Sequence, residues 1–441
     1  MTKREIIKMA DKHNVRFLRL MFTDIHGVLK NVEVPRSQFQ KALDGQILFD
    51  GSSIEGFSRI EESDMVLHPD LDTWRIFSWR SGDTWGTARL ICDVVYPDGR
   101  PFEGCPRSAL KRVVAQAKKK GYSMMAGPEA EFFLLPLDDD GDIVPETHDS
   151  AGYFDLSPVD EGEDVRRDVV HHLEMMGFEV EAAHHEVAPG QHEIDFKYAD
   201  AVDTADNLVT FKFIVRKIAA QHNMHATFMP KPFYGVNGSG MHCHQSLFKG
   251  GKNIFHSKSA EYELSKVCIR YIGGLLKHAR GFLAVTNPLV NSYKRLVPGF
   301  EAPTKVAWSE KNRSPLVRVP DRRGIGTRVE LRVPDPAANP YLALSVMLAS
   351  GLDGIASDID PGPPVNKNIY QMSVREQRRH KISDLPIDLG AAIEALEKDD
   401  VVKAALGDHI AEHYIAGKKA EWLDYLSMVH PWEQERYIST Y

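Results

Sequence analysis

Apolar and polar positions alternate along this chain, in some stretches with the period of a strand and in others with that of a helix. Residues 15–34 alternate with a period of two on both sides of a turn at 24–27, which predicts a β-hairpin. Residues 74–96 alternate in the same way and predict further strands. Helical periodicity predicts a first helix capped by Thr2 and Glu5, and others over residues 36–43, 107–120, 161–176, 200–221, 260–280 and 339–356, with two more after residue 388.

A turn-rich stretch at residues 96–101, with two prolines and one glycine, separates two regions of different pattern. The first hundred residues combine short helices with strands, so we expect a small α+β domain over 1–100 and a larger domain over 101–441. A chain of 441 residues is long enough for both. The longest apolar stretch, residues 341–356, is broken by serines, glycines and Asp353, which favours a buried helix over a membrane span.

The most informative stretch is the strand-like segment 127–134, which carries Glu129 and Glu131 among apolar residues. Because residues two apart project from the same face of a strand, the two carboxylates are expected side by side. Like charges held this close in a poorly solvated place repel each other. A cation must therefore lie between them or one must hold a proton, unless the strand is merely a solvated edge.

Two later segments favour the cation. A turn at Pro189 and Gly190 joins two short strands, so Glu186 and Glu193 can meet across it. His242 and His244 share one strand face, whereas alternation sends Cys243 to the other, so a zinc site of thiolate and imidazole is not favoured. Several carboxylates with one imidazole suit a hard divalent cation, magnesium or manganese.

Arginines gather towards the end of this region. A strand-like piece at 327–332 places Arg328, Glu330 and Arg332 on one face, and further arginines stand at 295, 313, 318, 322 and 323. Any one of them could belong to a solvated basic face. Beside buried carboxylates they suit bidentate binding of phosphate or carboxylate groups. The parts together predict a two-metal site for a nucleotide phosphate and an anionic substrate, beside a mobile loop at 291–303 that carries Glu301.

Composition excludes several other classes. The net charge of −8 gives no basic footprint for nucleic acid or an anionic membrane. Four scattered cysteines and a polar N-terminus without a signal sequence lead us to expect a cytoplasmic protein with reduced thiols. The acidic run at 138–142 lacks the ligand register of a calcium-binding EF-hand, so we expect a solvated turn there.

Seven stretches, in order along the chain, carry a resemblance to a known family. The chain resembles a type I glutamine synthetase over essentially its whole length, through residues 49–53, 127–132, 184–188, 237–244, 298–303, 312–314 and 330–332. The resemblance implies a β-grasp N-terminal domain and a catalytic domain whose antiparallel strands form a barrel-like funnel. It also implies a dodecamer of two stacked hexameric rings, with each active site shared between neighbouring subunits.

The resemblance implies roles for individual residues. By the family's pattern, one metal ion is held by Glu131, Glu186 and Glu193, and the other by Glu129, His242 and Glu330. Positions on the nucleotide side match Glu181, His244 and Ser246, with Arg313 and Arg318 handling phosphate. Glutamate-binding positions match Asn237, Gly238, Arg295, Glu301 and Arg332, and the ammonium pocket matches Asp50 and Ser53 of the neighbouring subunit with Tyr153, Glu186 and Glu301.

The activity implied by the resemblance is ATP-dependent ligation of ammonium to glutamate through a γ-glutamyl phosphate, with two or more Mg²⁺ (or Mn²⁺) ions per site. Asp50 is the candidate proton acceptor from ammonium, Arg313 a candidate for stabilising the phosphoryl charge and Glu301 the lid residue. Two alternatives stay open. The chain could ligate a larger amine, or be a silent regulatory homologue with possible nitrogen-regulatory partners; its intact carboxylates argue against the second.

Control is predicted from two further stretches. Residues 53–62 resemble those of the feedback-inhibited subtype, in which an arginine at the position of Arg59 reaches a neighbour's active site. Tyr370 occupies the place of a tyrosine that is adenylylated in another subtype, but its surroundings depart from that subtype's pattern. We therefore expect inhibition by glutamine through Arg59 and no modification of Tyr370.

Overall fold

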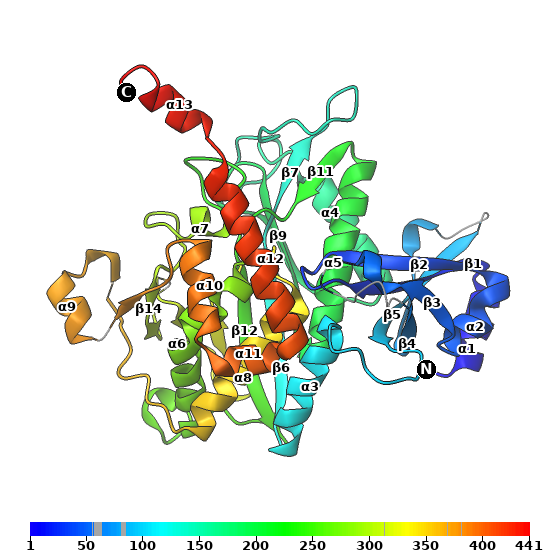
Figure 1. Ribbon diagram of the computed structural model, residues 1–441, viewed down its shortest axis with the longest axis horizontal. Helices are drawn as coiled ribbons and strands as arrows, with labels where there is room; N and C mark the ends of the chain where they lie inside the picture. Colours follow the sequence, from blue (N-terminus) through cyan, green and yellow to red (C-terminus); the bar gives the residue numbers. More distant parts are fainter. Residues whose placement is uncertain (55, 57–63, 81–84, 313, 368, 381) are drawn as a thin grey trace.

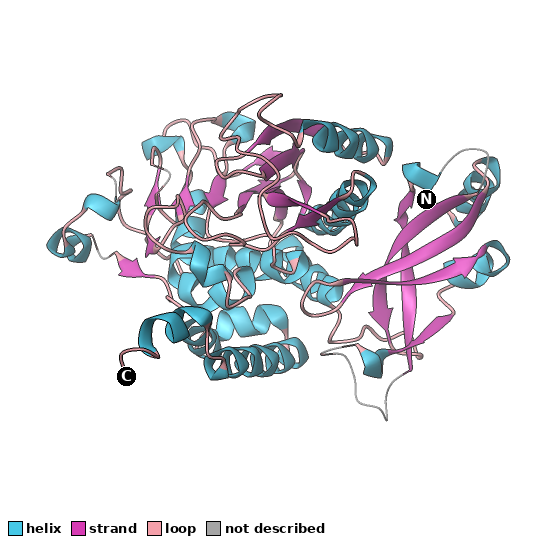
Figure 2. Cartoon of the chain, turned by 90° about the horizontal axis from the view of Figure 1, so that it is seen from above, coloured by secondary structure: helices cyan, strands magenta, loops and turns pink. Residues whose placement is uncertain are grey.

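The computed structural model describes residues 1–441 except 55, 57–63, 81–84, 313, 368 and 381. The N-terminal part is a five-stranded sheet in the order β2-β1-β5-β4-β3, formed by β1 (Val15–Thr23), β2 (Leu29–Pro35), β3 (Ile47–Asp50), β4 (Asp64–Ile76) and β5 (Gly86–Val95). Strands β1 and β5 are parallel and the other neighbours antiparallel. Helices α1 (Lys3–Lys12) and α2 (Phe39–Leu43) pack on this sheet, which lies at one end of the molecule beside the larger part (Figure 2).

The larger part contains two main sheets. The first, of seven strands, has the order β10-β6-β12-β17-β16-β15 with β13 beside β12, and its strands are β6 (Ser123–Ala130), β10 (Ala199–Asp200), β12 (Met241–Lys249), β13 (Lys252–Asn253), β15 (Trp308–Ser309), β16 (Val317–Arg318) and β17 (Val329–Leu331). The second, in the order β11-β7-β9-β8, contains β7 (Phe132–Pro136), β8 (Val180–His185), β9 (Gln191–Phe196) and β11 (Met224–Thr227). A small pair, β14 (Lys305–Val306) and β18 (Ser383–Asp384), lies to one side.

The larger part contains the helices α3 (Pro106–Lys119), α4 (Glu163–Met175), α5 (Ala201–Gln221), α6 (Lys266–Thr286), α7 (Ser292–Arg295), α8 (Pro340–Ala356), α9 (Val374–Arg379), α10 (Leu389–Glu397), α11 (Asp400–Leu406), α12 (Asp408–Ser427) and α13 (Pro431–Tyr437). Most of these helices pack beside the sheets, whereas α9 lies beyond β14 at one edge and α13 projects at the C-terminal end (Figure 1). As predicted, the apolar stretch 341–356 is a buried helix, which is α8. It packs on α6. Among the described residues, no helix has the length and apolar character that a bilayer crossing requires.

Most predicted elements are confirmed within a few residues, and the α+β class with a β-hairpin at the start is confirmed. Thr2 and Glu5 form the predicted capping box. Three predictions are wrong. The helix expected at 260–280 is α6, which begins later because the Ser265 hydroxyl caps it by accepting from the Cys268 amide. Four helices follow residue 388 in the described chain, not two, because Asp399 and Gly407 start new ones and Pro431 a third.

The third wrong prediction concerns the strand at 127–134, which is two strands in different sheets. Strand β6 ends at Ala130, and β7 begins at Phe132 in the other sheet. Between them, the Glu131 amide donates to the carbonyl oxygen of Gly240. The period of two runs through this crossover without a break, so the pattern alone could not reveal it. The crossover brings the two sheets together where the carboxylates gather.

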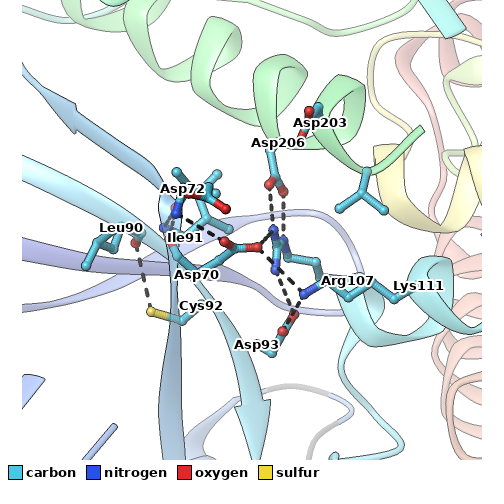
Figure 3. Close-up of polar contacts among 12 residues, drawn as sticks. Asp70, Asp72, Leu90, Ile91, Cys92, Asp93, Arg107, Lys111, Asp203 and Asp206 are labelled. Carbon is cyan, nitrogen blue, oxygen red and sulfur yellow. Dashed lines mark hydrogen bonds and ion pairs between the residues drawn. The ribbon is translucent and has the colours of Figure 1, made fainter. Parts of the chain in front are cut away.

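A buried arginine joins the two parts of the chain (Figure 3). Arg107 on α3 donates to both carboxylate oxygens of Asp206 on α5, at 2.9 and 2.8 Å. It also donates to Asp70 on β4 at 2.7 Å and to Asp93 on β5 at 2.9 Å. The Tyr341 hydroxyl donates to Asp206 as well, at 2.7 Å. This network fixes the N-terminal sheet against the helices of the larger part.

Candidate active site

Three neighbouring strands bring one imidazole and two carboxylates together. In the register of the sheet, His242 on β12 lies opposite Glu129 on β6, and His244 lies opposite Glu330 on β17. Ligand atoms of Glu129, His242 and Glu330 all lie within 4.8 Å of one another. The alternation along β12 turns His242 and His244 to this side and buries Cys243 on the other, as the sequence predicts.

The crossover at residue 131 supplies a second cluster. Glu131, Glu186 at the end of β8 and Glu193 on β9 have carboxylate oxygens within 4.8 Å of one another. The predicted meeting of Glu186 and Glu193 across the β8–β9 turn is therefore confirmed. Glu129 and Glu131 belong to different clusters, which corrects the expectation that they lie side by side. Both clusters line one cavity of about 360 Å³.

The carboxylates of the first cluster have hydrogen-bond donors as partners, and those of Glu330 are arginines. Arg318 donates to Glu330 at 2.7 Å, Arg332 pairs with its other oxygen, and His244 donates to Glu129 at 2.8 Å. Although burial raises the pKa of Glu330, Arg332 and the histidines lower it to about 2. Burial and the nearby Arg332 lower the pKa of His242 to about 4, so its imidazole is neutral and can offer a lone pair.

The second cluster has too little positive charge nearby. Burial and the repulsion from Glu186 and Glu193 raise the pKa of Glu131 well above its usual range. Burial also raises the pKa of Glu193, which faces other carboxylates, and that of Glu186. Three clustered carboxylates, two of them buried and that of Glu186 half-buried, have this deficit of cations and fit a hard divalent ion with oxygen ligands. The first cluster, with two carboxylates and a neutral imidazole, fits a second such ion.

Arginines and a loop close the cavity. Arg318, Arg328 and Arg332 line it together with Arg295, whose guanidinium donates to the backbone carbonyl of Val333 at 2.8 Å. A Cβ at position 240 would lie 2.5 Å from the Arg295 guanidinium, so only glycine allows this approach. The remaining walls come from predicted residues of three loops, Tyr153, Asn237, Gly238 and Glu301. The backbone of Glu301 has φ 57°, in the left-handed region that residues other than glycine seldom adopt.

A second cavity of about 210 Å³ continues from the first. Glu181 and Ser246 line it, and Glu129, Asp195, His244 and Arg328 line both cavities. Arg328 donates from Nε to His244 Nδ1 at 3.0 Å, which leaves the Nε2 proton of His244 for Glu129. Apolar atoms of Phe196, Tyr198 and Ile325 form much of the remaining wall. A polar, arginine-lined chamber that opens into a partly apolar one suits a nucleotide whose phosphates face the carboxylate clusters.

A family model described as the glutamine synthetase catalytic domain matches residues 103–437, and one described as the glutamine synthetase beta-grasp domain matches residues 14–97. The chain belongs to the glutamine synthetase family. Enzymes of this family make glutamine from glutamate and ammonia, with ATP and divalent metal ions. The β-grasp fold expected for the N-terminal part is confirmed, as is the half-barrel sheet of the larger part.

Relatives and solved structures agree with this membership. Glutamine synthetase from Thermus thermophilus is 61% identical over 443 residues, which cover 100% of this chain and 99% of the relative. Glutamine synthetase from Staphylococcus aureus (strain MRSA252) is 57% identical over 441 residues, with the same coverage. The structure of GmaS in complex with ADP has a TM-score of 0.90 at 35% identity over 98% of this chain and 99% of GmaS. That of Plasmodium falciparum glutamine synthetase has a TM-score of 0.88 at 26% identity over 99% of each chain.

Some residues that the glutamine synthetase pattern selects do not line these cavities. Asp50, at the end of β3, is exposed and accepts from the Ser52 amide at 2.9 Å and the Ser52 hydroxyl at 2.6 Å, which lower its pKa. Ser53 lies in the same turn. Neither residue is among those that line the cavities in this chain. Arg59 and Arg313 lie outside the described residues.

The structure adds residues that the sequence analysis gave no role. His184 donates to or accepts from Glu193 at 3.1 Å through Nε2, and Asp195 joins both in a third cluster. Burial and the charge of Glu129 raise the pKa of Asp195 to about 7. Gln191 donates to Glu131 at 2.7 Å. The alternation on β9, which puts residues 191, 193 and 195 on one face, was the signal that could have found Gln191 and Asp195.

Proposed function

We propose that this chain joins ammonium to the γ-carboxylate of L-glutamate through a γ-glutamyl phosphate, at the expense of ATP, and releases L-glutamine, ADP and phosphate. The proposal rests on one observation: both carboxylate clusters and several arginines line the same cavity. The chain also belongs to the glutamine synthetase family. A glutamate carboxylate is a poor electrophile, so amide formation needs its prior activation by phosphorylation.

Two divalent ions, Mg²⁺ or Mn²⁺, would be held by the two clusters, one by Glu131, Glu186 and Glu193 and one by Glu129, His242 and Glu330. When bound, such ions neutralise phosphoryl oxygens and align an in-line transfer. The protein contributes the fixed positions of these ligands. Gln191 and the Gly240 amide orient Glu131 by donating to Oε2 at 2.7 and 2.9 Å, and Arg332 orients Glu330.

The nucleotide would occupy the second cavity, along Glu181, His244 and Ser246. Arg318 faces the first cavity, and its guanidinium would stabilise the charge that develops on the transferred phosphoryl group. Arg313 is proposed for the same task by family resemblance. Because Arg318 is held by Glu330, the arginine is oriented before substrate binds. This preorganisation avoids a reorganisation cost during the reaction.

Glutamate would bind against Asn237, Gly238, Arg295, Glu301 and Arg332, all of which line the first cavity. Arg295 and Arg332 offer guanidinium groups to its carboxylates. We propose that Glu301 closes its loop over the acyl phosphate, because water would hydrolyse that intermediate and waste ATP.

Ammonium would be held where carboxylates concentrate negative charge, by Tyr153, Glu186 and Glu301 with Asp50 and Ser53 from a neighbouring subunit. Asp50 would take the proton and release the nucleophile ammonia. Its place outside the cavity of its own chain supports an active site shared between subunits of a dodecamer.

Mixed oligomers test whether the active site is shared between subunits. Subunits with Asp50→Ala and subunits with Glu131→Gln, each inactive alone, should regain activity together; no regain would contradict it.

The amine specificity is tested by phosphate release from ATP, Mg²⁺ and glutamate with ammonium, methylamine or a polyamine as acceptor. Ammonium should support the fastest release. A preference for a larger amine would make the chain a γ-glutamyl ligase for that amine, and release with no acceptor dependence would refute the ligase proposal altogether.

We further propose a role in nitrogen assimilation in the cytoplasm, with feedback inhibition by glutamine as in the non-adenylylated alpha subtype. Glutamine lacks the γ-carboxylate of glutamate, so Glu301 is free to pair with a cation, and Arg59 would supply one from a neighbour. The boundary at residues 100 and 101 stays a proposal, as does a regulatory protein partner.

A further inference from the structure

A third cavity, lined by charged side chains, lies where the N-terminal sheet meets the larger part. It has a volume of about 500 Å³. Its lining residues come from the β1–β2 hairpin on one side and mainly from α5 and the segment around the end of β11 on the other. These elements are labelled in Figure 1. None of its lining residues lines the two cavities of the proposed active site. The cavity is therefore a separate candidate site, independent of the proposed function.

The lining of this cavity is basic. Arg19 and Lys30 come from the hairpin, and Lys212 and Arg216 from α5. Among the described residues that line it there is no aspartate or glutamate. This imbalance contrasts with the net charge of −8 of the whole chain. Basic side chains without a carboxylate among the described lining residues favour a positive potential inside the cavity.

The two walls differ in how their cations are balanced. On the hairpin, Arg19 pairs with Glu33 at 2.8 Å, and Lys30 lies 3.6 Å from Asp24. On α5, neither Lys212 nor Arg216 has a carboxylate within 4.0 Å among the described residues. The Lys212 ammonium donates to the carbonyl oxygen of Pro336 at 2.6 Å, which satisfies a proton but not the charge. The unbalanced charge therefore lies on the α5 wall.

Lys212 and Arg216 are one helical turn apart and converge on the same aromatic ring. The Lys212 Nζ and the Arg216 Cζ lie 5.4 and 5.3 Å from the ring centroid of Phe228. Like charges at this spacing on a helix destabilise it. Burial and the neighbouring Arg216 lower the pKa of Lys212 to about 7, although Asp335 acts in the opposite direction. An anion between the Lys212 ammonium and the Arg216 guanidinium would offset their mutual repulsion. It would also accept hydrogen bonds from their N–H groups, which have no carboxylate within 4.0 Å in the described chain.

We propose that this cavity binds a small dianion, a phosphate or a dicarboxylate, between Lys212 and Arg216. Lys30 and Arg19 on the hairpin add positive charge from the opposite wall. The apolar side chains of Phe213, Phe228 and Met229 in the lining provide a surface for the carbon chain of a dicarboxylate. Because the two walls belong to different parts of the chain, the ligand would join the β1–β2 hairpin to α5.

Crystals of the full-length protein soaked in selenate give the most direct test. An anomalous peak is expected within hydrogen-bonding distance of both Lys212 Nζ and the Arg216 guanidinium. Peaks confined to the active-site arginines would overturn the proposal. The soak uses the parent protein, so it tests whether an anion binds at Lys212 and Arg216 even if a variant fails to fold.

Calorimetric titration with phosphate, succinate and acetate gives the affinity and separates the two classes of dianion. The variant Lys212→Gln/Arg216→Gln should bind its preferred dianion about 10–100-fold more weakly, as expected for the loss of charge-assisted hydrogen bonds. The matched control, Lys118→Gln/Lys119→Gln at the exposed end of α3, replaces two lysines outside the cavity and should bind as the parent does.

Tighter binding of phosphate than of succinate would assign a phosphoryl ligand, and tighter binding of succinate would assign a dicarboxylate. Equal binding by the double variant and the parent, or acetate binding as tightly as either dianion, would refute the site.

Discussion

Replacing Glu131 by glutamine should remove a metal ion while leaving the fold intact. Glu131 Oε2 accepts from Gln191 at 2.7 Å and from the Gly240 amide at 2.9 Å. The single oxygen of a glutamine amide can accept both bonds, and the side chain keeps its volume. The lesion is then confined to one negative charge that faces Glu186 and Glu193.

The size of the effect follows from charge and dielectric. Two unit charges 4 Å apart interact by about 4 kcal/mol at an effective dielectric constant of about 20, so a divalent ion gains about 8 kcal/mol from one carboxylate. Part of this gain is offset, because burial and the repulsion from Glu186 and Glu193 raise the pKa of Glu131 and so disfavour the ionised form that binds metal. We expect a net loss of about 3–4 kcal/mol, which corresponds to metal binding weaker by about 10²–10³-fold.

Calorimetric titration of the chelator-treated protein with Mg²⁺ or Mn²⁺ measures this loss, and turnover should nearly vanish with it. The control is Glu174→Gln on the exposed face of α4, which should bind metal as the parent does. Without metal, the Glu131→Gln variant should be at least as stable as the parent, because one of three clustered carboxylates is gone. Unchanged stoichiometry and affinity would refute the ligand assignment, and a large loss of metal-free stability would show that Glu131 serves the fold instead.

Four further predictions concern other parts of the chain. Arg107→Met removes the arginine that pairs with three aspartates, of which Asp70 and Asp93 keep Lys111. It should lower the free energy of unfolding by about 3–5 kcal/mol in chemical denaturation, and a loss below about 1 kcal/mol would contradict the role of the network. His278 is buried, which lowers its pKa, but two aspartates raise it overall, so its stabilising effect is complete at acidic pH and lost as pH rises through the folded pKa. The stability difference between the parent and His278→Gln should therefore shrink from pH 6 to pH 9, and a constant difference would exclude this linkage. Tyr370 should carry no adenylyl group in an intact-mass measurement on protein from its native source. Arg59→Ala should raise the glutamine concentration needed for inhibition without changing turnover, and equal sensitivity would rule out that mechanism.

Local signals were enough to predict much of the site. The period of two on β12 correctly separated His242 and His244 from Cys243, because alternation depends only on backbone geometry. The turn at Pro189 and Gly190 correctly brought Glu186 and Glu193 together, since a short turn between strands leaves few alternatives.

Contacts between residues far apart in the chain leave no comparable pattern in the sequence. The crossover at Glu131 depends on a hydrogen bond to Gly240, more than a hundred residues away, and its own stretch reads as one strand. Which cluster each carboxylate joins is decided by that tertiary contact. Asp50 shows the limit of a single chain. It ends β3 and lines neither cavity of its own chain, and its pairing with a neighbouring subunit stays a proposal.

The central claim is that glutamate is activated as an acyl phosphate before ammonia attacks it. Glutamate labelled with ¹⁸O in its γ-carboxylate tests this directly, because phosphorylation and displacement by ammonia carry one carboxylate oxygen into phosphate. With ATP, Mg²⁺ and ammonium, mass spectrometry should find one ¹⁸O atom in each phosphate released. Phosphate without the label, formed while glutamine accumulates, would contradict the proposed intermediate.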